Sequence, residues 1–255
     1  MGKRALRQFR ILAVAALIFA ALPAPAQDRQ FAPPPRPYKI VPLTPPQPMN
    51  DPAFDALRQQ LTDIAERKDR AALAKLVVSL GFFWDRENGD AADRRKTGID
   101  NLSAALGLAS SNGTGWDLLA TFASEPTASL SPDHKGVICS PADPTYDGKA
   151  LDALIDASDT DPIDWGYPVA PGVEVRETGD DKAPVIDKLG LYFVRVLPDA
   201  VSASPSFIHI VMPSGKSGYV AIDAIAPMGN DQLCYVPAVH GGWKIAGYVG
   251  GGEPQ

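Results

Sequence analysis

Cysteine and histidine are scarce in this chain of 255 residues. It has two cysteines, Cys139 and Cys234, and three histidines, His134, His209 and His240. A zinc site needs three or four such ligands that converge, and no C-x-x-C or H-x-x-x-H spacing groups them here. The sequence therefore predicts no metal site, and we expect no bound cofactor.

Motifs for nucleophilic catalysis and for phosphate binding are lacking as well. The segment Gly215-Lys216-Ser217-Gly218 does not match G-x-S-x-G, and Asn112-Gly113-Thr114-Gly115 lacks the lysine of a phosphate loop. Two enzyme alternatives stay open. One is a thiol at Cys139 paired with His209 or His240, and the other is a pair of carboxylates that cleaves glycans. The carboxylates available in or near the helical region are Glu66, Asp85, Glu87 and Glu125. No residue is assigned a catalytic role.

Long apolar runs are absent apart from one of 12 residues, from Ile11 to Leu22. A membrane-spanning helix needs about 20 apolar residues, so a permanent anchor is not expected. Ala24-Pro25-Ala26 follows the run, and four basic residues precede it, namely Lys3, Arg4, Arg7 and Arg10. This pattern is typical of a cleaved secretory signal over residues 1–26. We expect a periplasmic or secreted protein with no stable membrane insertion after cleavage.

Positive charge is in the minority once this segment is removed. Residues 1–26 hold four basic and no acidic residues, so 20 basic side chains remain against 30 acidic ones, a net charge near −10. Such a surface disfavours nucleic acid and anionic lipid as partners. In an oxidising compartment the two cysteines most simply form a disulfide, Cys139–Cys234. A reactive thiol is the alternative.

Proline dominates residues 27–50, which contain eight of them. Proline cannot donate a backbone hydrogen bond, so we expect a spacer in polyproline II or disordered conformation. A ligand for another domain is the alternative function of this segment.

Apolar residues three and four apart predict a helical domain over residues 51–125, which begins at the capping pair Asp51-Pro52. Trp84 and Trp116 belong to its aromatic cluster, for which we expect a bundle core, with a ligand cleft as the alternative. Residues 126–168 have no sustained periodicity and are expected to form an irregular connector. The aspartates there lack the glycine and glutamate of a calcium loop.

From Val173 onward the spacing becomes that of strands. Residues 173–176 and 207–211 alternate, and a turn at residues 212–218 leads into another strand at 219–222. A final hairpin pairs residues 233–236 with residues 243–249. Short strands separated by Gly and Pro indicate a compact barrel or sandwich.

These strands carry a resemblance to bacterial SH3-like domains. Val173-Glu174-Val175-Arg176 resembles the opening V-x-V-R strand, and Ala183-Pro184-Val185-Ile186 with Leu189-Gly190 resembles the second block. Phe207 to Val211 takes the place of the W-x-x-V strand, and Gly215 to Val220 resembles the closing G-x-x-G-[WY]-V hairpin. The first loop and the connection before Phe207 depart from the family pattern. The helical region resembles uncharacterised exported bacterial proteins that pair such a segment with this domain.

The resemblance implies an α+β protein in which the helical domain is followed by a small SH3-like β-barrel over residues 169–250, with an extra hairpin. It also implies a non-catalytic cell-envelope protein that binds peptidoglycan, a peptide or a protein partner; a cell-wall hydrolase is the alternative function. By analogy, the ligand-binding residues are expected to be Tyr192, Phe207, Tyr219, Trp243, Glu177 and Asp181. Phe207 and Tyr219 as barrel core is an equally open reading. We further expect the disulfide to join the helical part to the barrel.

Overall fold

The computed structural model describes residues 34–197 and 206–251. The expected signal segment and the start of the Pro-rich stretch lie outside the described residues. The described residues form an α+β structure with sheets of two, seven and six strands. All strand pairs in them are antiparallel except β15 with β2, which run parallel.

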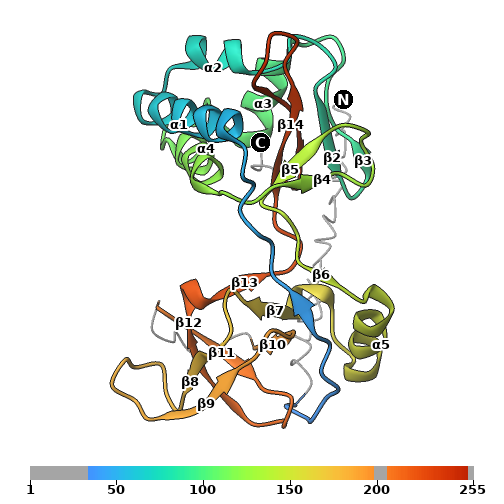
Figure 1. Cartoon of the computed structure of the whole chain (residues 1–255), viewed down its shortest axis with the longest axis vertical. Coiled ribbons are helices and arrows are strands. Elements are labelled where there is room, and N and C mark those ends of the chain that lie inside the picture. Colours follow the sequence, from blue (N-terminus) through green and yellow to red (C-terminus); the bar gives the residue numbers. More distant parts are fainter. Residues whose placement is uncertain (1–33, 198–205, 252–255) are drawn as a thin grey trace, which may run out of the picture. The chain divides into compact units, whose positions relative to one another are not determined.

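Four helices and the six-stranded sheet share one hydrophobic core (Figure 1). The helices are α1 (Pro52–Arg67), α2 (Arg70–Leu76), α3 (Gly98–Leu106) and α4 (Thr114–Ser124). The sheet has the order β3-β2-β15-β14-β5-β4. Its strands are β2 (Phe83–Arg86), β3 (Gly89–Asp90), β4 (Ser129–Leu130), β5 (Ile138–Ser140), β14 (Gln232–Pro237) and β15 (Trp243–Val249).

The prediction of a separate N-terminal helical domain is therefore wrong. The C-terminal hairpin β14–β15 does not extend a barrel but forms the centre of the sheet against which the helices pack. The rings of Phe54 in α1 and Tyr235 pack edge to face, with centroids 5.2 Å apart. The rings of Phe122 in α4 and Tyr248 do the same, with centroids 6.0 Å apart. The spacing of apolar residues indicates which side of each helix is buried. It does not indicate which distant strand covers that side.

A β-bulge in the hairpin explains how its apolar residues reach the helices. Tyr235 pairs with Ile245, but Cys234 pairs with Gly247, so Ala246 is the extra residue. The bulge shifts the alternation by one position, and Ile245 and Tyr248 consequently both join the helix-facing core. Trp84 and Trp116 are buried in this same core, in agreement with the prediction that they are core residues.

Seven strands form the second large sheet, in the order β13-β7-β10-β11-β12-β8-β9. They are β7 (Trp165–Pro168), β8 (Val173–Arg176), β9 (Val185–Leu189), β10 (Val194–Val196), β11 (Phe207–Val211), β12 (Ser217–Ala221) and β13 (Ile225–Pro227). In the described part of the chain no pairing joins β9 to β13, so the expected closed barrel is not found. The strand positions themselves agree closely with the alternation in the sequence.

Both faces of this sheet bury apolar side chains. One face has a core centred on Val175, Val194, Ile210 and Val220. The opposite face packs Trp165 and Phe193 against helix α5 (Gly148–Ser158), next to the two-stranded sheet of β1 (Leu43–Thr44) and β6 (Thr145–Tyr146). Two short 3-10 helices, η1 (Pro162–Asp164) and η2 (Ile222–Ala224), precede β7 and β13.

Part of the Pro-rich segment is packed against the protein rather than extended into solvent. Val41 and Leu43 are buried in the core with Trp165 and Phe193. The backbone N–H of Leu43 donates to Leu191, and that of Phe193 donates to Val41, at 3.1 and 3.2 Å. The apolar residues between the prolines anchor the segment, which is why residues 38–44 differ from the expected spacer.

The disulfide Cys139–Cys234 is confirmed. The two cysteines are directly opposed on the neighbouring strands β5 and β14, with Cα atoms 4.0 Å apart. The expectation that the bond ties the helices to a barrel is wrong, because both strands belong to the sheet that the helices cover. The bond lies on the opposite face of that sheet, beside Val137, Phe83 and Val236.

Two general properties of the described residues bear on the compartment. None of the helices in this part of the chain has the length and hydropathy needed to cross a bilayer. The disulfide is consistent with an oxidising, extracytoplasmic location.

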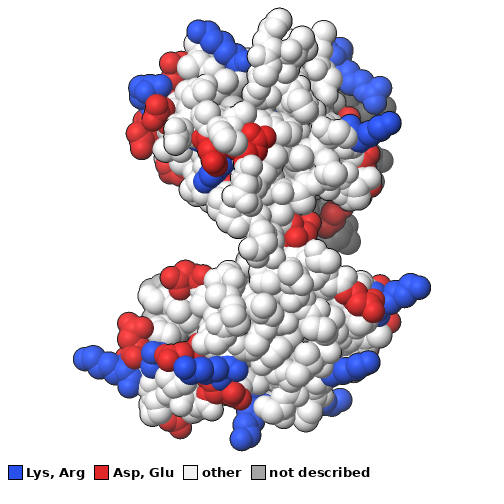
Figure 2. Space-filling view, viewed as in Figure 1, with Lys and Arg blue, Asp and Glu red and all other residues white. Residues whose placement is uncertain are grey.

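On the face seen in Figure 2, basic and acidic side chains are interspersed over the surface.

Candidate functional site

The hairpin β11–β12 places two ring side chains side by side on one face of the seven-stranded sheet. His209 and Tyr219 are direct partners in the register of this hairpin, and their rings stack with centroids 4.5 Å apart. Phe207 lies two residues before His209 on the same strand face and is buried. We call Phe207, His209 and Tyr219 the aromatic face.

The loop between β8 and β9, residues 177–184, is well ordered by its own hydrogen bonds. Its ends are joined by the Glu177 N–H, which donates to the Pro184 carbonyl at 3.0 Å. The Asp180 side chain accepts from the Lys182 N–H at 2.8 Å, and the Arg176 guanidinium donates to the Ala183 carbonyl at 2.8 Å. These bonds fix the path of the loop, so its exposed carboxylates project from a defined backbone.

Gly179 brings this loop onto the aromatic face. A β-carbon at this position would lie 3.4 Å from both Cβ of Phe207 and Cδ1 of Tyr219, an ordinary van der Waals distance, so the loop backbone passes about one methyl group away from these two side chains. Glu177 and Asp181 flank the contact and are exposed to solvent. The loop that carries Glu177 and Asp181 therefore passes close to Phe207 and Tyr219, and His209 stacks on Tyr219.

The other two expected residues lie elsewhere. Tyr192 pairs with Pro42, where the Pro-rich segment crosses the sheet. Trp243 lies on β15 in the six-stranded sheet, and its indole N–H donates to Oδ2 of Asp51 at 3.0 Å. Asp51 also caps α1 by accepting from the Ala53 N–H at 2.8 Å. Trp243 thus fastens the start of the first helix to the last strand.

The bond from Trp243, together with those from Ala53 and Phe54, holds the pKa of Asp51 below its usual value. The ionised form of Asp51 accepts all three hydrogen bonds, so the native contacts favour that form. This pair has a structural explanation and needs no ligand.

The thiol alternative fails because Cys139 is oxidised in the disulfide. His134 pairs with Asp85 at 2.6 Å and stacks on the ring of Phe83. This contact ties the loop after β4 to β2. Among residues 34–197 and 206–251, no group of three or more His, Cys, Asp or Glu side chains could hold a metal ion.

The four carboxylates considered for glycan cleavage are spread over different parts of the structure. Asp85 and Glu87 line one cavity together with Asp231. Glu66 is exposed on the last turns of α1, and Glu125 lines a different groove. Two of the four carboxylates, Asp85 and Glu87, thus share a cavity, and Asp85 is already paired with His134.

Comparison of the chain with protein-family models, with curated proteins and with solved structures returns no match. The site has to be argued from its own residues. The sequence identified the aromatic positions but treated His209 only as the polar position of a strand. Pairing the two strands about the turn at residues 212–218 would have placed His209 opposite Tyr219. The contact at Gly179 had no signal in the sequence.

Proposed function

We propose that this protein is an exported, non-catalytic component of the cell envelope that binds peptidoglycan, a peptide or a protein partner through the aromatic face and the β8–β9 loop. On this proposal residues 1–26 are removed as a signal peptide and the mature protein is periplasmic or secreted. The proposal keeps the SH3-like relationship for residues 173–220 only, without a closed barrel and without the hairpin β14–β15, which belongs to the other sheet. Its support is that the four resembling blocks fall on four strands in the same order, β8, β9, β11 and β12.

The observation that carries the proposal is the close approach of the loop, at Gly179, to Phe207 and Tyr219. Stacked rings give a flat, weakly polar platform, and the partly exposed Tyr219 contributes both a ring face and a hydroxyl. On the neighbouring loop, the side-chain carboxylates of Glu177 and Asp181 have no hydrogen-bond or ion-pair partner within the described residues. An aromatic platform edged by unpaired carboxylates suits a ligand with an apolar or sugar-ring surface and hydrogen-bond donors.

Sedimentation with purified peptidoglycan tests this proposal directly. We expect the mature chain, residues 27–255, to pellet with the wall material at low and moderate salt. Tyr219→Ala combined with Glu177→Gln and Asp181→Asn is expected to weaken binding by at least about tenfold, as for the loss of a central aromatic contact. Thermal unfolding of the triple variant shows whether it stays folded.

Two control variants separate this face from the rest of the surface. Trp243→Phe keeps an aromatic ring in the six-stranded sheet, and Asp152→Asn with Asp156→Asn removes two exposed carboxylates of α5. Both are expected to bind as the unmodified chain does. If the unmodified chain does not pellet, wall binding is excluded, and crosslinking in whole cells must then yield one partner whose capture depends on Tyr219.

A further inference from the structure

The described residues also form a groove of about 680 Å³, and none of the residues of the aromatic face lines it. A volume of this size is in the range of small-molecule sites, roughly 300–1,000 Å³. Phe122 and Val169 contribute apolar walls. Much of the remaining lining is proline, from six positions, Pro45, Pro46, Pro48, Pro126, Pro141 and Pro227.

The lining has many acceptors and few donors. Proline has no backbone N–H, so six of the lining residues offer only carbonyl oxygens, of which those of Pro126 and Pro141 already accept from Met49 and Gln232. The lining contains two carboxylates, Glu125 and Asp231, and no lysine, arginine or histidine. Other N–H groups are already used, since that of Ala142 donates to Oγ1 of Thr127 and that of Val169 donates to Ala224. A ligand rich in donors and positively charged matches this lining.

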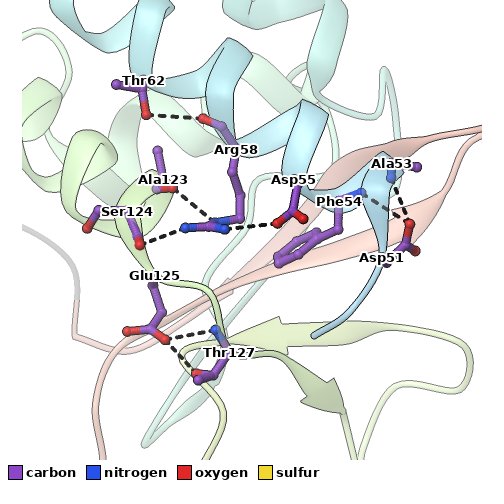
Figure 3. A network of polar contacts seen from close by, with 10 residues as sticks. All are labelled: Asp51, Ala53, Phe54, Asp55, Arg58, Thr62, Ala123, Ser124, Glu125 and Thr127. Carbon is purple, nitrogen blue, oxygen red and sulfur yellow. Dashed lines mark hydrogen bonds and ion pairs between the residues drawn. The ribbon is translucent and has the colours of Figure 1, made fainter. Parts of the chain in front are cut away.

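Glu125 is held in place by a network that Figure 3 shows from close by. Arg58 of α1 donates to the carbonyl oxygens of Ala123 and Ser124, at 3.2 and 2.7 Å, and so fixes the last turn of α4. Glu125 follows at once, and its Oε1 accepts from both N–H and Oγ1 of Thr127 at 2.9 and 2.6 Å. The second oxygen, Oε2, is left available on a side chain that is already oriented.

Tyr167 is the polar group that points to a ligand. Its side chain is only 4 % exposed, it lines the groove, and its hydroxyl makes no hydrogen bond within the described residues. Burial, with the charges of Asp143 and Glu125, raises the pKa of Tyr167 to about 12, so the phenol is neutral at physiological pH. The hydroxyl oxygen is not among the fully buried atoms that lack a partner, so it opens onto the groove, where a ligand can bond to it.

Asp231 supplies the second carboxylate. Its Oδ2 accepts a hydrogen bond from the Tyr248 hydroxyl, and Tyr248 is anchored in the core of the six-stranded sheet. This bond orients the carboxylate, and the other oxygen, Oδ1, lies against Gly250 and accepts no hydrogen bond within the described residues. Two held carboxylates and a neutral phenol thus face one apolar groove.

We propose that this groove, lined by Glu125, Tyr167 and Asp231, binds a small organic cation in which an ammonium group is attached to an apolar ring. The ammonium donates to the free carboxylate oxygens, and the ring packs on the proline and Phe122 walls. This site is separate from the aromatic face and does not depend on the proposed function.

The test uses 2-phenylethylamine as the probe and 2-phenylethanol as its neutral counterpart, with the mature chain in calorimetric and NMR titrations. We expect the amine to bind at least about tenfold more tightly than the alcohol, since a hydrogen bond to a charged group contributes roughly 1.5–3 kcal/mol. The shifts in the NMR spectra should centre on Tyr167 and Val169. Equal affinity for both probes, or shifts centred on Tyr219, would overturn the proposal.

Variants decide whether the carboxylates are responsible. Glu125→Gln and Asp231→Asn keep the size of each side chain, and each is expected to weaken amine binding by roughly tenfold or more while leaving alcohol binding unchanged. Thr121→Arg, at an exposed position of α4 that lines the groove, should abolish amine binding by charge and by volume. The control Asp63→Asn, an exposed carboxylate of α1, should bind normally. Unchanged amine affinity in Glu125→Gln and Asp231→Asn would also refute the proposal.

Discussion

Ending the chain at Asn230 removes the hairpin β14–β15 and is expected to unfold the helices while the seven-stranded sheet stays folded. The truncated chain keeps all of α1–α4 and every strand from β7 to β13. It carries Cys139→Ser so that no unpaired thiol remains. If the helices formed their own domain, as their sequence suggests, this truncation would leave them intact.

The size of the effect follows from the core. Leu233, Tyr235, Ile245 and Tyr248 are all fully buried against the helices. Burying one large apolar side chain contributes about 1.5–3 kcal/mol, so the four together contribute roughly 6–12 kcal/mol. The whole stability of a typical domain is about 5–15 kcal/mol. The truncation therefore removes an amount comparable to the entire stability of the helical part.

Far-UV circular dichroism and tryptophan fluorescence report the two parts separately. Trp84 and Trp116 are buried in the core that the helices share with the hairpin, whereas Trp165 is buried in the seven-stranded sheet. We expect loss of most helical signal and exposure of Trp84 and Trp116 to water. With Trp84→Phe and Trp116→Phe added, the remaining emission from Trp165 should stay that of a buried indole and change cooperatively in urea.

The reasoning would be refuted by a truncated chain that retains its helical signal and unfolds cooperatively with the urea midpoint of the full chain. A milder substitution gives an independent check. Ile245→Ala in the full chain is expected to lower the free energy of unfolding by about 2–5 kcal/mol, and the helical signal should be lost at correspondingly lower urea.

Two further predictions concern bonds within this part of the chain. Replacing both cysteines by serine opens a loop with a sequence separation of 95 residues and should lower the free energy of unfolding by roughly 4–5 kcal/mol, measured in urea without reductant; an unchanged midpoint would contradict it. The pKa of Asp51 is lower in the native state than in the unfolded state, so its contribution to stability is complete above the unfolded pKa of about 4 and is lost as the pH falls through the native pKa. The stability difference between the unmodified chain and Asp51→Asn should therefore shrink from pH 5 to about pH 2, and a difference that does not vary with pH would refute the assignment.

The sequence predicted the individual elements better than their assembly. The cap at Asp51-Pro52, the strands at residues 173–176 and 207–211, and the pairing of the two cysteines could all be read from local spacing and composition. The partner of each element could not, because β2 and β15 lie more than 150 residues apart in the chain and pair in parallel. Alternation identifies a strand face, but it does not specify which helix or strand will cover that face.

The candidate sites divide in the same way. Phe207 and Tyr219 were recognisable as aromatic positions, whereas the approach of Gly179 depends on the path of a loop. The groove had no local signal, because Glu125, Tyr167 and Asp231 come from three distant segments. Trp243 was assigned to the wrong sheet together with its whole hairpin, because a strand that follows a run of strands was assumed to join the same sheet.

The late position of β15 in the chain has a kinetic consequence. Trp84 donates its indole N–H to the carbonyl of Gly250, so the two residues of this contact are 166 positions apart in the chain. Any process that delivers the chain from its N-terminus onward, synthesis included, presents four amphipathic helices before the strands that cover them exist. Long-range pairing of this kind folds slowly. The apolar faces of α1–α4 are then exposed until the last segment of the chain is available. During that interval these faces offer a chaperone the largest apolar surface to bind.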